Sequence, residues 1–216
     1  MATALVRVPG RECSVPALLL GLATAAVTCV ASPARADHEA VNETRPSAVM
    51  FLSQSLEGES TNYHILGAAD NRDDVRWRGF GVRTGFGFDL FRALEFGFHH
   101  TLVNSRSQDD SLENLKGSRF SAESKIILTS PIVNVEVGGG VSTSRLDYQR
   151  HEDTATVSGE GSYLSLSANR FLASNLSLFG YVHQGHEQLE RSGGTDIVES
   201  LKGTSVAGGA GIDVWF

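Results

Sequence analysis

The sequence predicts an all-β fold, a closed antiparallel eight-stranded transmembrane β-barrel. Apolar and polar residues alternate with a period of two along most of the chain after residue 36. Short and long connections take turns between the alternating stretches, and no apolar run after residue 36 is long enough for a transmembrane helix. Because successive side chains of a strand point to opposite faces, each predicted strand has one apolar and one polar face.

The start of the chain has a different character from the rest. Two arginines give it a positive charge, an apolar stretch follows, and Ala34-Arg35-Ala36 supplies the small residues of a signal-peptidase site. The alternative is a transmembrane anchor, which the shortness of the apolar run disfavours. We expect residues 1–36 to be a signal peptide cleaved after Sec-type export, 37–46 a periplasmic N-terminal segment, and 47–216 the barrel.

Composition excludes several kinds of site. Both cysteines, Cys13 and Cys29, fall within the predicted leader, so we expect no disulfide, thiol nucleophile or cysteine metal site in the exported chain. The net charge of −7 argues against nucleic-acid binding, which needs a basic surface. We expect no cofactor and no metal.

Eight stretches show the alternation. The clearest is 76–90, where Phe80, Val82 and Phe86 share one face while Gly81 and Arg83 share the other. The first stretch is the least regular, and it is needed to make the number of strands even. The expected strands are 47–58, 76–90, 93–104, 117–130, 132–145, 158–171, 175–188 and 203–216.

The connections between these strands alternate in length. Those at 91–92, 130–131 and 172–174 are tight. The others are long, polar and rich in acidic residues, and they cover 59–75, 105–116, 146–157 and 189–202. Tight turns at one end and long loops at the other are typical of bacterial outer-membrane barrels, whose long loops lie outside the cell.

A soluble, lipocalin-like barrel would also alternate, with its apolar face inward. The polar faces here consist mainly of Gly, Ser and isolated charges, whereas a water-facing surface would be rich in Lys, Glu and Thr. Small residues suit a narrow barrel interior, and a continuous apolar face suits lipid. The transmembrane barrel is therefore favoured.

The last strand ends in GGAGIDVWF, residues 208–216. Gly211, Val214 and Phe216 resemble the C-terminal signal that the barrel-assembly machinery reads in outer-membrane proteins. The chain after the leader resembles the small OmpA/OmpX-like barrels in strand number, loop alternation and ending. This resemblance implies an integral protein of a Gram-negative outer membrane. Its implied partners are outer-membrane lipid, lipopolysaccharide and, during biogenesis, the assembly machinery.

Several ionisable residues fall on the polar, inward faces. They are Arg83, Asp89, Glu95, His99, Arg119, Glu123, Lys125, Glu136 and Asp213. A turn near 130–131 would place Lys125 directly opposite Glu136, a cross-strand pair that supports register. Such charges could form a network that fills the barrel, or they could line a narrow, porin-like ion path. The first interpretation is favoured.

Histidines near the end of the seventh strand are the candidate catalytic residues. His183, His186 and Glu187 lie where the seventh strand should meet the outer surface. Small barrel enzymes that modify lipid A use His with hydroxyl and carboxylate partners. A deacylase resembling the PagL family would have Ser two residues after its His, whereas Gly185 follows His183 here. The acidic loops also lack the ordered spacing of a calcium site. We therefore expect a non-enzymatic, structural or surface-interaction role through acidic extracellular loops, with an unknown extracellular partner.

Overall fold

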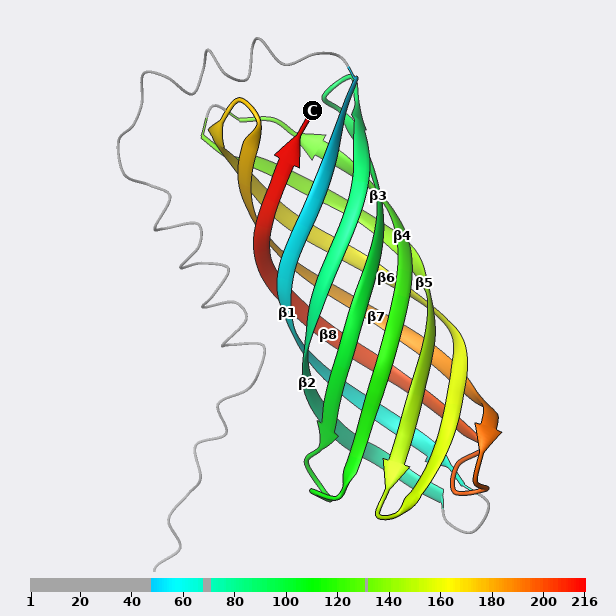
Figure 1. Cartoon of the computed structure of the whole chain (residues 1–216). Coiled ribbons are helices and arrows are strands. Elements are labelled where there is room, and N and C mark those ends of the chain that lie inside the picture. The colour runs from blue at the N-terminus through cyan, green and yellow to red at the C-terminus, as the bar shows by residue number, and fades with distance from the viewer. Residues whose placement is uncertain (1–47, 68–70, 131) are drawn as a thin grey trace, which may run out of the picture.

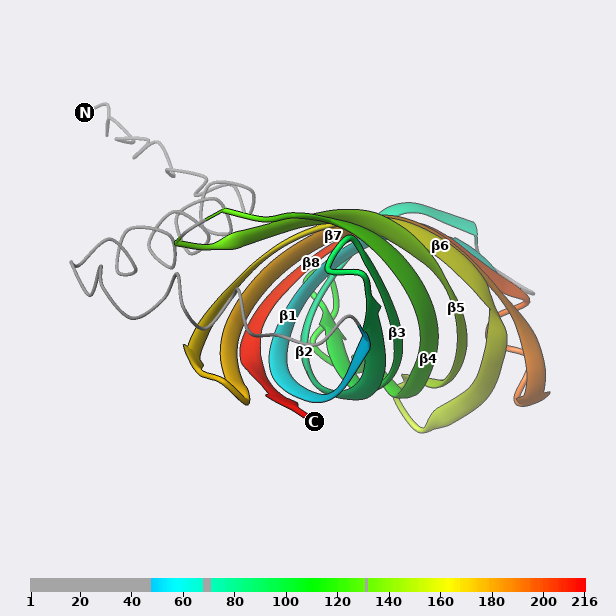
Figure 2. The same ribbon diagram turned by 90° about the horizontal axis from the view of Figure 1, so that it is seen from above.

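The computed structural model describes residues 48–67, 71–130 and 132–216, and these form a closed barrel of eight antiparallel strands (Figure 1). Each strand pairs with the next along the chain, and the last pairs with the first (Figure 2). The predicted signal peptide and N-terminal segment lie outside the described residues. The strands are β1 Ala48–Leu66, β2 Asn71–Leu90, β3 Leu94–Ser107, β4 Glu113–Leu128, β5 Asn134–Arg150, β6 Asp153–Ala173, β7 Leu176–Gly194 and β8 Ser200–Trp215. No helix long and apolar enough to cross a membrane occurs in this part of the chain.

The closure between β1 and β8 is regular, although the first strand had the weakest pattern. The two strands pair from Phe51 opposite Trp215 to Leu66 opposite Ser200. Odd-numbered residues of β1 point inward. Because Val49 and Phe51 are apolar yet inward and buried, the start of β1 has apolar residues on both faces. This hid its alternation in the sequence.

The barrel has two different ends. We call proximal the end that holds Phe216, the start of β1 and the turns between β2 and β3, β4 and β5, and β6 and β7 (top of Figure 1). The turn between β2 and β3 is tight, with Ala93 N–H donating to the Leu90 carbonyl at 3.1 Å and positive φ angles of 55° at Phe91 and 57° at Arg92. We call the opposite end distal.

The predicted long distal loops are wrong, because strands continue through most of these residues. The hairpin of β5 and β6 pairs up to Arg150 opposite Asp153, so His151 and Glu152 alone form its turn. The hairpin of β1 and β2 likewise pairs up to Leu66 opposite Asn71. Strands of 14 to 21 residues are longer than the roughly 10 residues that a tilted strand needs to cross a bilayer. The hairpins therefore extend the barrel well beyond one membrane thickness.

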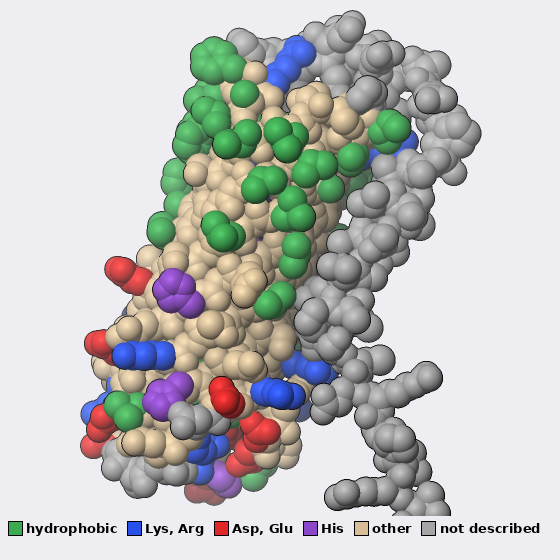
Figure 3. All heavy atoms as spheres, turned by 180° about the vertical axis from the view of Figure 1, so that it is seen from behind, with side chains coloured by type: hydrophobic (Ala, Val, Ile, Leu, Met, Phe, Trp, Pro, Cys, Tyr) green, Lys and Arg blue, Asp and Glu red, His purple; other side chains and the backbone are tan. Residues whose placement is uncertain are grey.

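A belt of exposed apolar side chains surrounds the proximal half of the barrel, and Figure 3 shows the part of it on one face. On β3 it runs from Leu94 to Leu102, and on β4 from Phe120 to Leu128, which matches the span of a transmembrane strand. Every strand contributes outward residues with relative exposure above 40%. Among them are Met50, Leu52, Leu56, Phe80, Phe86, Leu94, Phe98, Leu102, Phe120, Ile126, Leu128, Val137, Val141, Leu164, Leu166, Leu178 and Ile212. The fold is thus a transmembrane barrel, with its apolar face outward as predicted.

Beyond the belt the apolar face changes sides while the period of two continues. On β5, Val137 and Val141 point outward within the belt, but farther along the strand Leu146 and Tyr148 point inward and Arg145 and Asp147 outward. The same change occurs on every strand. The inward side chains form a distal core of Tyr63, Ile65, Val75, Trp77, Val103, Leu115, Leu146, Tyr148, Ala155, Val157, Leu189, Val198 and Leu201.

A smaller apolar cluster closes the proximal end. Val49, Phe51, Phe171 and Trp215 are all inward and buried. The Trp215 ring centroid lies 4.7 Å from that of Phe51 and 5.5 Å from that of Phe171. The neighbouring Phe216 is exposed, on the lipid side of the barrel. The barrel interior therefore has an apolar region at each end, the distal core and this proximal cluster.

The distal core predicts a measurable contribution to stability. Leu115→Ala removes a buried side chain from this core and should lower the free energy of unfolding by about 2–5 kcal/mol. The measurement is urea unfolding of the protein in lipid vesicles, followed by tryptophan fluorescence. Leu112→Ala makes the same chemical change at an exposed turn position and should stay within about 0.5 kcal/mol. Equal losses in both variants would contradict a packed core.

Candidate functional site

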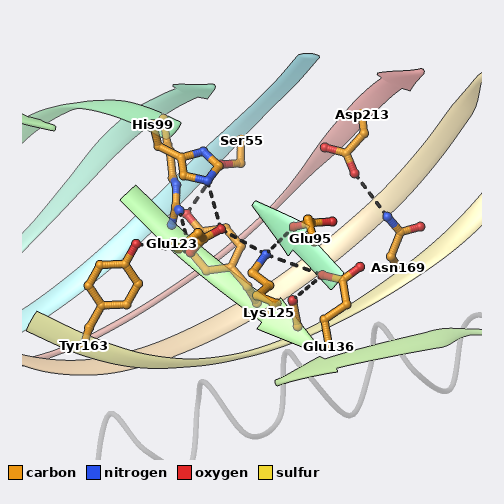
Figure 4. A network of polar contacts seen from close by, with 12 residues as sticks. Ser55, Glu95, His99, Glu123, Lys125, Glu136, Tyr163, Asn169 and Asp213 are labelled. Atoms are coloured by element: carbon orange, nitrogen blue, oxygen red, sulfur yellow. Dashed lines mark hydrogen bonds and ion pairs between the residues drawn. The ribbon is translucent and has the colours of Figure 1, made fainter. Parts of the chain in front are cut away.

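A polar layer fills the barrel between the distal core and the proximal cluster (Figure 4). Every ionisable residue predicted on the inward faces lies there, with its side chain buried or nearly so. These residues are Arg83, Asp89, Glu95, His99, Arg119, Glu123, Lys125, Glu136 and Asp213. Strand parity alone therefore located the network.

Lys125 is the centre of the proximal part of this layer. Its Nζ atom lies 3.0 Å from Glu95 Oε1, 3.0 Å from Glu123 Oε1 and 3.4 Å from Glu136 Oε2. The Ser167 hydroxyl donates to Glu136 at 2.6 Å. One ammonium group thus holds together carboxylates from three strands, β3, β4 and β5.

The predicted direct opposition of Lys125 and Glu136 is wrong by two residues. Lys125 lies opposite Gly138 on β5 and opposite Glu95 on β3, so its contact with Glu136 is diagonal. The cause is the connection after β4, which is longer than a two-residue turn. There the Ser130 hydroxyl donates to the Val133 carbonyl at 2.6 Å and accepts from the Val133 N–H at 3.2 Å.

Glu123 joins this centre to the next cation. Its Oε2 atom lies 3.2 Å from Arg83 Nη2 and accepts from the Tyr163 hydroxyl at 3.1 Å, while its Oε1 atom lies 2.8 Å from His99 Nε2. Arg83 also lies 3.9 Å from Glu57 and over the ring of Tyr181. A single buried carboxylate is therefore compensated from several directions, as burial of charge requires.

Arg119 organises the distal part of the polar layer. Its guanidinium lies 3.2 Å from Glu59 and 3.1 Å from Glu187, and its Nε donates to the Ser144 hydroxyl at 3.2 Å. Tyr63 donates to the same Glu187 carboxylate. Glu187, predicted as a weak catalytic candidate, is thus a structural partner of Arg119.

The structure contains a recurring unit, not predicted from the sequence, in which a tyrosine lies against a glycine of the neighbouring strand. Tyr63 is directly opposite Gly203, Tyr163 opposite Gly140, and Tyr181 opposite Gly209. A Cβ atom at these glycines would come within 2.5, 2.7 and 2.8 Å of the respective tyrosine side chain. The glycines therefore make room for rings inside a narrow barrel.

Each of these tyrosines also binds one glutamate of the polar layer. Tyr63 donates to Glu187, Tyr163 to Glu123 at 3.1 Å, and Tyr181 to Glu57 at 2.7 Å. The sequence does contain a signal for this unit, because glycines occur on the inward face of strands whose neighbours carry inward tyrosines. Reading it required the strand register, which the sequence alone did not supply.

Two glutamates of β1 were missed for a related reason. Glu57 and Glu59 are inward and interact with Arg83 and Arg119. The odd parity of β1 places both of them inside, but Glu59 was expected in a loop and the first strand looked irregular. With the strand ends known, parity would have identified both residues.

The candidate catalytic histidines lie on opposite faces of β7. His183 is inward and buried, with its ring centroid 5.0 Å from that of Tyr163 and 5.8 Å from that of Tyr181. His186 is outward and exposed. The two imidazoles are therefore not brought together. Within the described ranges, no group of three His, Cys, Asp or Glu side chains is arranged to hold a metal ion.

A second ionic cluster lies at the distal end, in a segment that was expected to be a loop. The fully buried Glu113 lies 2.6 Å from Arg72 and 3.2 Å from Arg150, and it accepts from Tyr148 at 3.2 Å. Burial, followed by the nearby Glu113 carboxylate, raises the pKa of the Tyr148 phenol to about 12, so the phenol stays protonated and donates. This cluster covers the distal core.

The space left in the polar layer is small. One cavity of about 20 Å³ lies between the Arg83 and Arg119 groups, and His183 and Glu187 are among its lining residues. That volume holds about one water molecule. The polar layer is therefore a packed network of side chains.

The fold is similar to those of solved outer-membrane barrels. Neisserial surface protein A matches with a TM-score of 0.51 and 13% identity, over 74% of this chain and 96% of that chain. OprG from Pseudomonas aeruginosa matches with a TM-score of 0.47 and 9% identity, over 80% of this chain and 97% of that chain. No protein-family model and no curated protein matches the sequence. The predicted resemblance to small eight-stranded outer-membrane barrels is confirmed for the fold.

The polar layer predicts a large penalty for removing its central cation. Lys125→Met would leave Glu95, Glu123 and Glu136 without the ammonium that they share, and should cost about 3–5 kcal/mol of unfolding free energy. Lys202→Met is the matched control, because Lys202 is exposed on the outward face of β8. Its change should stay within about 0.5 kcal/mol. Urea unfolding in vesicles measures both, and a Lys125 variant as stable as the control would refute the assignment.

Proposed function

We propose that this protein is an integral barrel of a Gram-negative outer membrane, exported by the Sec route, with a structural or surface-interaction role. The exposed apolar belt supports insertion into a bilayer, and the fold supports the choice of membrane. In this proposal the distal hairpins project outside the cell and present acidic tips, such as Asp109, Asp110, Glu152 and Asp196. The assembly machinery would read Gly211, Val214 and Phe216 during biogenesis.

A closed interior is the observation that supports a non-conducting role. Side chains fill the barrel in three successive layers, namely the proximal cluster, the polar layer and the distal core. An eight-stranded barrel is just wide enough for side chains to fill it. An ion would have to pass the aromatic rings of Trp215 at one end and Trp77 at the other. The packed interior therefore supports a charge network that fills the barrel over a porin-like ion path.

The closed interior makes a direct electrical prediction. Purified full-length protein reconstituted in planar bilayers should give no unitary conductance steps above the detergent background. A porin reconstituted in the same way controls for the bilayer, and a heat-modifiable band on a gel verifies that the protein is folded. Reproducible steps that scale with the amount of folded protein would overturn the non-conducting role.

The direction of insertion is the second part of the proposal. Outer-membrane barrels place their short turns in the periplasm and their longer hairpins outside. The proximal end holds Phe216 and lies within the apolar belt, whereas the distal hairpins extend well past the belt. This geometry supports an external distal end.

Cysteine labelling tests that direction, because both natural cysteines lie in the predicted leader. Glu152→Cys places a thiol in the distal turn of β5 and β6, and Asn175→Cys places one in the proximal turn of β6 and β7, both at exposed positions. A membrane-impermeant maleimide should label the first variant on intact cells and the second only after lysis. The reverse pattern would contradict the proposed orientation.

A further inference from the structure

The outward face of β2 to β5 carries a row of basic side chains just distal to the apolar belt. The row consists of Arg78 on β2, Arg106 on β3, Lys116 on β4 and Arg145 on β5, and all four side chains are exposed. None of them makes an ion pair with another of the described residues. We call these four residues the basic row.

Strand register makes the row continuous. Arg78 lies directly opposite Arg106. Asn104 lies opposite Lys116, so Arg106 and Lys116 are diagonal neighbours on one face. Directly opposed residues are about 5 Å apart and diagonal ones about 7–8 Å, which is within reach of long side chains.

The row continues onto β5 in the same way. Ser118 lies opposite Arg145, so Lys116 and Arg145 are diagonal neighbours. Two acidic residues lie near this end. Asp147 is opposite Lys116 and accepts a hydrogen bond from Thr156 at 2.8 Å, and Glu160 is diagonal to Arg145. Two carboxylates therefore lie at the β5 end of the row, and at the β2 end Asp109 lies just distal to it, where it accepts from the Arg76 backbone N–H at 3.2 Å.

Like charges directly opposite each other on a sheet are destabilising. The Arg78 and Arg106 pair therefore disfavours the isolated barrel unless an anion lies between the two guanidiniums. Guanidinium groups bind phosphate with two parallel hydrogen bonds, which makes phosphate a well-matched anion.

Apolar side chains adjoin the row on its proximal side. Phe80 follows Arg78 on the same face of β2, and Phe120 lies on the same face of β4 as Lys116. Leu102 lies between them on β3, and all three are more than half exposed. A ligand that covers both regions needs an anionic head and apolar chains, and it must lie at a membrane surface.

The other side of the barrel lacks such a row among the described residues. At the corresponding level β6, β7 and β8 present Glu160, His186, Gln188 and Lys202. The positive charge is thus concentrated on one side.

We propose that the basic row binds the headgroup of a diphosphorylated glycolipid of the lipid A type, with its acyl chains on Phe80, Leu102 and Phe120. A row that crosses four strands offers separate cations to two phosphates. This proposal rests on the proposed function, because such a lipid belongs to the outer leaflet, where the distal end would lie. It deepens that function by giving the lipid surface a defined site.

The test uses purified full-length protein in a neutral detergent, titrated with diphosphorylated lipid A and followed by native mass spectrometry. Arg106→Gln with Lys116→Gln removes the two central charges of the row, and we expect binding to weaken about tenfold or more. The control variant combines Arg191→Gln with Lys202→Gln, which neutralises one arginine and one lysine at exposed positions elsewhere. It should bind like the unaltered protein. A heat-modifiable band verifies that both variants are folded.

Three further probes identify what the row recognises. Monophosphorylated lipid A should bind more weakly than the diphosphorylated form, and phosphatidylethanolamine should not compete. Inorganic phosphate competing as well as lipid A would show a free-anion site and overturn the proposal. Equal weakening in both double variants would overturn it in favour of general electrostatic attraction. A lack of lipid A binding by the unaltered protein would also overturn the proposal. A protein partner would then be the remaining candidate ligand of the basic row.

This experiment and the cysteine labelling fail independently. Labelling from outside the cell at Glu152→Cys without lipid A binding would leave the proposed function intact and remove the glycolipid site. If lipid A binds in detergent but the labelling pattern is reversed, the basic row would still be a glycolipid site. Its proposed position at the outer leaflet would be contradicted.

Discussion

The structure depends on one constraint, which is that a strand alternates with a fixed period of two while its surroundings change from lipid to water. Within the belt Val137 and Val141 of β5 point outward to lipid, and the polar layer is inside. Beyond the belt an apolar exterior would face water, so Leu146 and Tyr148 turn the apolar face inward. The exchange needs no bulge on β5, because only the identity of the residues changes.

Strand parity was enough to predict much of the polar layer, although not the distal core. The fold class, the outward belt and inward residues such as Arg83, Glu123 and Lys125 all followed from alternation. In contrast, hairpin register depends on the length of a turn. The Ser130 turn moved Glu136 two residues from its expected position opposite Lys125. A shift of two residues leaves every side chain on the same face, so alternation could not reveal it and contacts between strands could not be derived.

The strand ends were the larger error, and they have a physical cause. Residues such as Thr61, Tyr63 and Ile65 of β1 look like a polar loop when apolar residues are expected to face outward. They form a strand because the inward Tyr63 and Ile65 side chains pack in the distal core. The pairing of Tyr63 with Gly203 of β8 was hidden for the same reason, since Tyr63 was expected in a loop and had no assigned face.

The positions of the two tryptophans give the barrel a spectroscopic property. Trp77 belongs to the distal core and Trp215 to the proximal cluster, so the chain carries one indole at each end. The Trp215 indole donates to Ser177 at 2.9 Å, whereas the Trp77 indole nitrogen has no hydrogen-bond partner among the described residues. Their emission spectra should therefore differ. When one tryptophan is replaced by phenylalanine, the fluorescence of the other would show when its own end of the barrel packs during membrane insertion.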